Sequence, residues 1–262
     1  MSTSPAQLPP SPEPVPFPPL RPSRTLPAGE GWTWIVQGWR LFARSPLMWI
    51  LSLLIVIVAM IVIGLVPILG HIVVNVLQAV IAGGYAVACR SLEQGGDFEL
   101  EQLFAGFRTR LTSLLVVGLV LLAGTIVILL VFAAFVGFSI LPVLFSGDQV
   151  AISSAVMNSI MSILLGGLVA AALFVPLTAA YWFAPALVIL SGMGPLEAMK
   201  ESFIGCMRNF VPFLVYGIVM FVFAIVAAIP LGLGYLVFVP VAIASVYAGY
   251  RGIFTEGAAV PA

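Results

Sequence analysis

The chain has 262 residues, of which 62% are hydrophobic and 8% are charged, and its formal net charge at pH 7 is zero. A soluble domain carries roughly 25% charged residues, so this composition excludes a water-soluble globule and indicates a protein embedded in a bilayer. The zero net charge gives no support for nucleic-acid binding, which needs a dense basic face.

The first segment, residues 1–28, contains ten of the twenty prolines and no apolar run. Proline fixes φ and lacks an amide donor, so the segment favours extended polyproline II structure. We therefore predict a disordered tail rather than a signal peptide; the alternative is a ligand for a proline-reading partner. Removal of residues 1–27 is expected to leave stability unchanged.

Six uncharged runs that follow are long enough to cross the hydrocarbon core as helices. The fourth run contains Pro176 and Pro185, which predict a kink or a tilt. Residues 137–161 separate the third run from the fourth, and we expect a short surface helix there over Ala151–Met161. The six runs are Leu47–Val66, Ile72–Cys89, Leu111–Val136, Ser162–Leu190, Val211–Ile229 and Leu231–Tyr250.

Six spans place all ten Lys and Arg residues on one side of the membrane. The other side receives the turns at Pro67 and Pro230 and the 137–161 connection, none of which carries a Lys or Arg. By the positive-inside rule the basic side is cytoplasmic. We therefore predict a multi-pass protein of a bacterial inner membrane with both ends in the cytoplasm.

The spans belong to three sequence repeats, residues 32–90, 99–190 and 195–251. Each repeat has an amphipathic opening segment, an outgoing span, a proline-containing turn and a returning span. The predicted fold is an all-α transmembrane helical bundle over residues 29–255, with tails at 1–28 and 256–262. The opening segments are Trp32–Arg44, Glu99–Arg110 and Leu196–Arg208.

Apolar residues recur at three- and four-residue spacing in the first opening segment, as Trp32, Ile35, Val36, Trp39 and Phe42. Such a stripe is typical of a helix lying in the membrane interface, with basic residues near anionic headgroups. The alternative is a linker helix packed on the ends of the bundle. The candidate interfacial residues are Trp32, Trp39, Arg40, Phe42, Arg44, Arg108, Arg110, Lys200 and Arg208.

The returning spans carry pairs of small residues four apart, which allow close helix packing in lipid. We therefore expect the returning helices at the centre of the bundle and the outgoing helices nearer its rim. The candidate packing residues are Ala79, Gly83, Gly166, Gly167, Ala170, Ala244 and Ala248.

Residues that could perform chemistry are few. His71 is the only histidine and has no metal-ligand companions, so no metal site is predicted. Cys89 and Cys206 are interpreted as small apolar packing residues. The amides Asn75 and Gln78 are expected to bond a neighbouring helix, with contact to a solute as the alternative.

The acidic stretch Glu93–Glu101 is interpreted as a solvated turn rather than a cation site. No Asp, Glu, Lys or Arg lies within a predicted span, which argues against a proton-coupled pump. Neither a catalytic motif nor a cofactor-binding motif is present, so no cofactor is predicted and we expect a protein that is not an enzyme.

The run Pro195–Phe203, followed by Asn209, and the opening from Gly31 to Pro46 carry a family resemblance. Over residues 30–255 the chain resembles an uncharacterised family of proteobacterial six-span membrane proteins. More distantly it is similar to the membrane domain that precedes the catalytic domain in some glycerophosphodiester phosphodiesterases. The sequence contains no such catalytic domain, so the resemblance implies neither an activity nor site residues.

These observations favour a non-catalytic membrane protein that acts as a scaffold, an assembly factor or a lipid-interacting module. Its expected partners are the bilayer, anionic lipids and other membrane proteins. The alternative is a transporter or channel for a neutral or lipidic solute, because repeats and interrupted helices are common in transporters. A continuous polar cavity would favour the transporter, whereas a dry and fully packed bundle would favour the first interpretation.

Overall fold

A computed structural model describes residues 22–146 and 149–255, with the side chains of residues 138–159 outside the description. The described chain is helical and has no strand. Its elements are α1 (Glu30–Arg44), α2 (Pro46–Gly64), α3 (Leu69–Glu93), the 3-10 helix η1 (Leu100–Phe104), α4 (Ala105–Thr109), α5 (Leu111–Ser146), α6 (Gln149–Trp182), α7 (Ala184–Ser191), α8 (Pro195–Arg208), α9 (Phe210–Ala228) and α10 (Tyr235–Phe254).

Six helical segments are long and apolar enough to cross a bilayer, which confirms the six-span prediction. Each matches one of the six uncharged runs, with ends that differ by a few residues. The segments are Pro46–Gly64, Leu69–Glu93, Leu111–Gly137, Ile160–Ser191, Phe210–Ala228 and Tyr235–Phe254.

The connection at 137–161 differs from the expectation of a loop with a separate surface helix. Helix α5 continues to Ser146, and Gln149 already begins α6, so the segment Ala151–Met161 is part of one long helix. Gly137 directly follows the predicted end of the third span and Pro142 lies a few residues later, but α5 continues through both of them. The predicted interruption of the fourth span lies at Phe183, where α6 ends and Pro185 occupies the first turn of α7.

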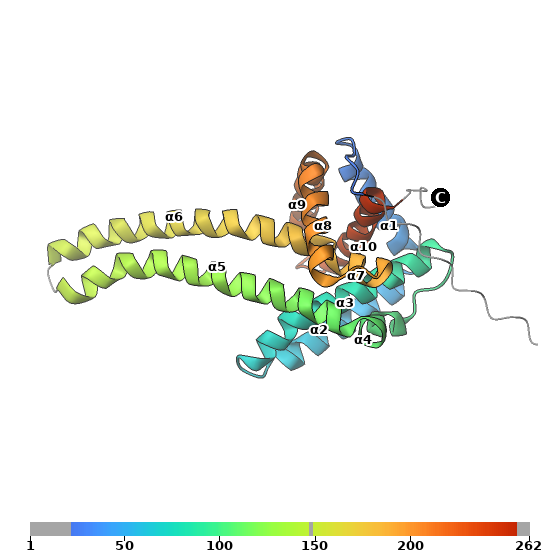
Figure 1. Ribbon diagram of the computed structural model, residues 1–262, viewed down its shortest axis with the longest axis horizontal. Helices are drawn as coiled ribbons and strands as arrows, with labels where there is room; N and C mark the ends of the chain where they lie inside the picture. Colours follow the sequence, from blue (N-terminus) through green and yellow to red (C-terminus); the bar gives the residue numbers. More distant parts are fainter. Residues whose placement is uncertain (1–21, 147–148, 256–262) are drawn as a thin grey trace, which may run out of the picture.

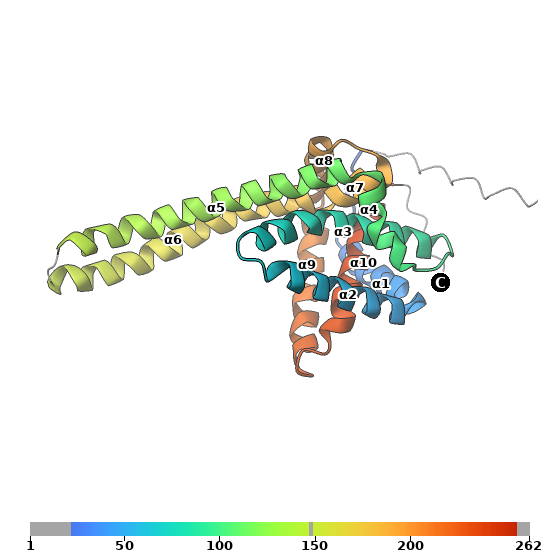
Figure 2. The same cartoon turned by 90° about the horizontal axis from the view of Figure 1, so that it is seen from below.

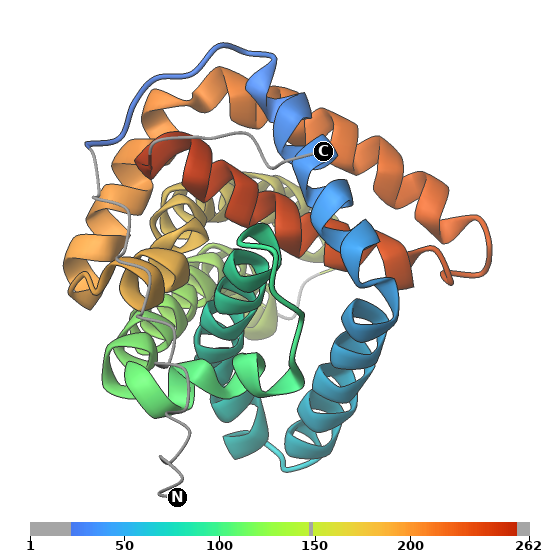
Figure 3. The same cartoon turned by 90° about the vertical axis from the view of Figure 1, so that its right-hand side faces the viewer.

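The six spans form three hairpins, α2–α3, α5–α6 and α9–α10, which diverge from a shared base. Figures 1 and 2 show that α5–α6 extends furthest along the long axis and that α9–α10 lies across it. In Figure 3, viewed along that axis, α1 crosses the α9–α10 hairpin, and α10 passes in front of the α5–α6 hairpin. We call the region where α1, η1, α4, α7 and α8 meet the hairpins the base.

The opening helix of each repeat packs on the returning helix of another repeat. Helix α1 packs on α10, η1 and α4 pack on α3, and α8 packs on α6 and α7. The first repeat thus contacts the third, the second contacts the first, and the third contacts the second. The three repeats therefore form a closed ring.

A small residue makes the close approach at each of these three contacts. A Cβ atom at Gly38 would collide with the carbonyl oxygen of Val241. A Cβ atom at Gly106 would likewise collide with the carbonyl oxygen of Val80. In the third repeat, Ser202 Oγ donates to the carbonyl oxygen of Ala179 at 2.7 Å. An aromatic residue follows each small one in sequence, as Trp39, Phe107 and Phe203.

The largest buried side chains lie at the base. Trp49 stacks on Tyr85 with ring centroids 5.5 Å apart and also contacts Phe98. Phe183 contacts Phe254 at 5.6 Å, which joins α7 to α10. The core therefore joins the three repeats at their shared end and leaves the outer parts of the hairpins apart.

The expected centre-and-rim arrangement holds for two of the three hairpins. Half of the apolar segments of α3 and α10 is buried, against 17% for α2 and 22% for α9. The returning helix of the second repeat is the exception, because 6% of its apolar segment is buried. Only the base end of that span, α7, is central, since α6 extends away from the other hairpins (Figure 1).

The structure also changes the boundary of the N-terminal tail. Residues 1–21 lie outside the described residues, but Ser23–Leu26 is bonded across the base. The amide of Leu26 donates to Asn209 Oδ1 at 2.8 Å, and Asn209 Nδ2 donates to the carbonyl oxygen of Arg24 at 2.9 Å. Arg208 donates to the carbonyl oxygen of Ser23 at 2.7 Å. Removal of residues 1–27 would therefore break these bonds, contrary to the expectation that it is harmless.

Candidate functional site

The predicted interfacial residues are mostly on the surface, but the apolar stripe of α1 is divided. Trp32 and Trp39 are 50% and 52% exposed, whereas Phe42 is 5% exposed and packs into the base. The face that α1 turns toward the bundle carries Trp34 and Leu41 beside Phe42, so the expectation that Phe42 contacts lipid is wrong. The reason is the close approach at Gly38, which rotates this face toward α10.

The predicted basic residues are exposed, but several of them also bond within the protein. Arg44 donates to the carbonyl oxygen of Leu92, and Arg108 forms an exposed ion pair with Glu101 at 3.3 Å. Arg40, Arg110 and Lys200 are exposed as well, like Arg208.

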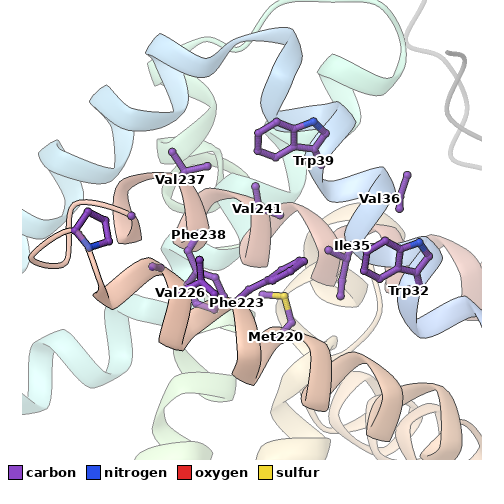
Figure 4. Close-up of a pocket in the computed structure, with 13 residues that line it drawn as sticks. Trp32, Ile35, Val36, Trp39, Met220, Phe223, Val226, Val237, Phe238 and Val241 are labelled. Carbon is purple, nitrogen blue, oxygen red and sulfur yellow. The ribbon is translucent and has the colours of Figure 1, made fainter.

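An apolar groove lies where α1 diverges from the α9–α10 hairpin. Its volume is about 570 Å³, within the range of about 300–1,000 Å³ typical of small-molecule sites. Figure 4 shows side chains of α1 on one side and those of α9 and α10 on the other. We call it the α1 groove, and it is lined by Trp32, Ile35, Val36, Trp39, Met220, Phe223, Val226, Ala227, Pro230, Gly234, Val237, Phe238 and Val241.

The packing of α1 explains why the groove is there. Gly31 and Gly38 bring one face of α1 against the backbones of α9 and α10. Trp32 and Trp39 lie on a neighbouring face, and their bulk holds open the space beside the hairpin. Trp32 reaches Phe223 of α9 with ring centroids 6.4 Å apart, which closes one side of the groove.

One basic residue lies on α1 beside the residues that line the groove. Arg40 follows Val36 by four residues, so both lie on the same face of α1. Its side chain is exposed, directly after Trp39 in sequence. The groove thus has an apolar lining that includes two tryptophan rings of α1, and an exposed arginine lies on the same helix.

A second space, the central cavity, lies where the hairpins begin to diverge. Its volume is about 440 Å³, and all three repeats contribute to its wall. Gln78, which sequence analysis expected to bond a neighbouring helix, lines this cavity, while Asn75 donates to the carbonyl oxygen of His71 in its own helix at 2.8 Å. The lining residues are Leu53, Val56, Met60, Gln78, Ile81, Ala82, Tyr85, Ala86, Thr178, Tyr181, Trp182, Pro185, Ala186, Ile243, Val246 and Tyr247.

Below the central cavity, a polar cluster joins the base ends of α3 and α10. Glu93 forms an ion pair with Arg251, and Tyr247 Oη donates to Glu93 Oε2 at 2.5 Å. Sequence analysis placed Glu93 in a solvated turn, but α3 continues to this residue and turns its carboxylate toward α10. Glu93 and Arg251 have opposite charges and lie at the same end of the predicted bundle. This combination is the sequence signal that could have indicated the pair.

The small residues predicted to pack do so at most positions. Ala79, Gly83, Ala244 and Ala248 are buried, and Gly166 abuts Phe135 of α5. Gly167 has open space where a side chain would begin, and Ala170 is half-buried, so the second repeat packs through fewer of these residues. Gly118, which was not singled out, makes a closer approach, because it faces the backbone of Val76.

Both cysteines are buried and free, as expected of apolar packing residues. Burial raises the pKa of the Cys206 thiol to about 12, and the neighbouring Ser202 side chain opposes this shift. The thiolate is the nucleophilic form, and burial disfavours it at neutral pH.

Comparison with known proteins gives one informative match. The chain is 30% identical over 250 residues to a probable inner membrane protein of Burkholderia thailandensis. The aligned region covers 87% of this chain and 92% of that protein. No family model and no solved structure matches the chain. With its six apolar helices, the chain is a multi-pass inner membrane protein that belongs to the same family as this Burkholderia protein.

Proposed function

We propose that this protein is a non-catalytic membrane protein that binds bilayer lipid, with an acyl chain in the α1 groove. The observation that carries the proposal is the almost wholly apolar lining of an open groove of about 570 Å³. A space of this kind inside a bilayer is not filled by water, because its walls offer water no hydrogen bonds. An acyl chain fills it and restores the dispersion contacts that the walls would otherwise lack.

The positive charge of Arg40 determines where the headgroup of the bound lipid lies. Arg40 lies on the same face of α1 as the groove and is exposed, and a basic residue near a membrane surface attracts anionic lipid by about 1 kcal/mol. Trp32 and Trp39 suit the boundary between headgroups and acyl chains, where tryptophan is enriched. The bound lipid is therefore an anionic phospholipid, with its phosphate near Arg40.

The orientation belongs to the same proposal. The base contains the described basic residues Arg44, Arg110, Arg208 and Arg251, whereas the tips of the α2–α3 and α9–α10 hairpins have none. This asymmetry supports a cytoplasmic base. The distant likeness to the membrane domain of glycerophosphodiester phosphodiesterases agrees with a lipid environment, and we infer no activity from it.

A carrier of a lipidic solute is the second candidate function. The central cavity favours it, because the returning helices of all three repeats line that space. Neither cavity has the polar lining that a channel for water-soluble solutes needs. A scaffold without a bound ligand would leave both spaces unexplained.

Lipid retention by two matched variants tests the proposal. Val237→Phe places a larger side chain in the groove, whereas Val222→Phe makes the same change on α9 outside it. Native mass spectrometry of protein extracted in mild detergent should show several-fold less bound phospholipid for Val237→Phe and no change for Val222→Phe. Equal retention by the two variants would contradict the proposal.

The choice of headgroup is tested separately. Arg40→Gln should reduce the preference for phosphatidylglycerol over phosphatidylcholine, and Lys200→Gln, an exposed change on α8, should not. An unchanged preference in Arg40→Gln would remove the headgroup from the proposal.

A further inference from the structure

We propose that the central cavity is a second binding site, for an uncharged lipidic molecule that carries a hydrogen-bonding group such as an ester carbonyl or a hydroxyl. The site is separate from the α1 groove, since no residue lines both. Its test can therefore fail without affecting the proposal for the groove, and the reverse is also true.

The lining of the cavity favours a ligand that is mostly apolar. Side chains such as Leu53, Ile81 and Val246 make up most of the lining, and no lining residue is charged. The ion pair between Glu93 and Arg251 lies at the base ends of α3 and α10. Its two charges neutralise each other, and Tyr247 also donates a hydrogen bond to Glu93. A charged ligand would lose its hydration here without gaining a partner, which is costly within a membrane.

Two polar side chains in the wall define the second requirement. Gln78 and Tyr181 line the cavity and make no hydrogen bond or ion pair with any residue in the described part of the chain. Three other hydroxyl groups of the wall are bonded within the protein: Thr178 Oγ1 donates to the carbonyl oxygen of Phe174 at 2.9 Å, Tyr85 Oη donates to Ser52 Oγ at 3.4 Å, and Tyr247 bonds Glu93. The cavity thus has satisfied polar groups and, beside them, an amide and a phenol that are unpartnered within the protein.

The lack of a hydrogen-bond partner matters for Gln78 because of where this residue lies in its helix. It lies fifteen residues before the base end of α3, about 22 Å of helix at 1.5 Å per residue, and therefore deep in the span. An amide in an apolar surrounding costs about 1–3 kcal/mol when it lacks a partner. Amides in membrane spans usually bond another helix, and Asn75 bonds its own helix one turn away. A ligand with a carbonyl or hydroxyl group supplies what Gln78 and Tyr181 lack.

Three probes with different headgroups test the inference. The purified full-length protein is incubated in detergent with dioleoylglycerol, with dioleoyl phosphatidylglycerol or with hexadecane, and bound molecules are counted by native mass spectrometry. The variants are Gln78→Leu and Tyr181→Phe, which remove polar atoms at nearly constant size. Asn75→Leu is the matched control, because it removes an amide from the same helix outside the cavity.

We expect dioleoylglycerol to bind the wild type and Asn75→Leu equally. Each cavity variant should bind it about 2- to 10-fold more weakly, the loss expected for one hydrogen bond. Hexadecane should bind the cavity variants at least as well as the wild type, because it needs no polar partner. Either variant that folds suffices for this comparison.

Two results would overturn the inference. Unchanged dioleoylglycerol binding in both cavity variants would mean that the polar groups do not select the ligand. Phosphatidylglycerol that competes with dioleoylglycerol in the wild type and loses binding in Gln78→Leu would assign a charged ligand to this cavity. The groove variant Val237→Phe should leave dioleoylglycerol binding unchanged, which keeps the two sites distinguishable.

Discussion

The ion pair between Glu93 and Arg251 provides the sharpest prediction about stability. The two residues are close to the base ends of α3 and α10, and their side chains are 17% and 10% exposed. Loss of one partner leaves the other charge buried and unpaired, which destabilises a protein by about 3–5 kcal/mol. Loss of both partners removes both charges, so their replacement by apolar residues of similar size is often neutral or stabilising.

A double-mutant cycle measures this coupling. Glu93→Met and Arg251→Met should each lower the free energy of unfolding by about 3–5 kcal/mol, and the double variant should lower it by less than either single change. Tyr247→Phe should cost about 1.5–3 kcal/mol, as expected for a hydrogen bond to a charged group. Unfolding by SDS in mixed micelles, followed by circular dichroism, gives the free energies.

The exposed pair between Arg108 and Glu101 is the control. Its side chains are 69% and 77% exposed, so solvent screens the interaction and its loss should cost at most about 1 kcal/mol. If the costs of Glu93→Met and Arg251→Met simply add in the double variant, the two charges are not coupled. If either change costs no more than the loss of the exposed pair, burial does not strengthen the interaction.

Three further predictions follow from the packing and the topology. Asn209→Ala should lower the unfolding free energy by about 1–3 kcal/mol, because the bonds to residues 24–26 and the packing of that segment are lost; an unchanged midpoint in SDS would show that the segment is not held there. Gly118→Ala should destabilise the protein because its Cβ would lie 2.5 Å from a backbone oxygen of α3, whereas Gly167→Ala should be neutral or stabilising by up to about 1 kcal/mol in the same assay. In spheroplasts, an impermeant thiol reagent should label Ile72→Cys and leave Gln94→Cys unlabelled, and the reverse pattern would invert the proposed orientation; Gln94 is preferred to Gly95, whose φ of +82° disfavours a side chain.

The sequence predicted the spans well because their signal is local. Twenty or so consecutive apolar residues form a helix in a bilayer whatever their neighbours are. The threefold repeat was likewise visible as a recurring order of amphipathic segment, span and proline turn. The ring of contacts could have been suspected from the small-aromatic pairs Gly38-Trp39, Gly106-Phe107 and Ser202-Phe203.

The sequence could not indicate which face of α1 is buried. Trp34 and Trp32 differ by two positions, and each belongs to a plausible apolar stripe, so periodicity alone does not choose between them. The choice is made by Gly38, whose contact with α10 joins segments about 200 residues apart in the chain. The α1 groove depends on that rotation, so its outline could not be predicted, although Trp32 and Trp39 were named as candidates.

The bonds of Asn209 and Glu93 depend on chain segments that meet only at the base. Asn209 bonds the segment before α1, and Glu93 bonds the end of α10. A polar residue beside a helix end is usually solvated, so each position had an ordinary interpretation in the sequence.

Photo-crosslinking from the groove tests most directly whether this protein binds lipid there. A photoreactive phenylalanine analogue is introduced at Val237 in the α1 groove, and in a second variant at Val222 outside it, and cells are irradiated before extraction. If lipid occupies the groove, the Val237 probe yields mainly an adduct with the mass of an anionic phospholipid, several-fold more abundant than at Val222. A Val237 probe that links mainly to another polypeptide would show that the groove is a protein-docking surface and does not bind lipid.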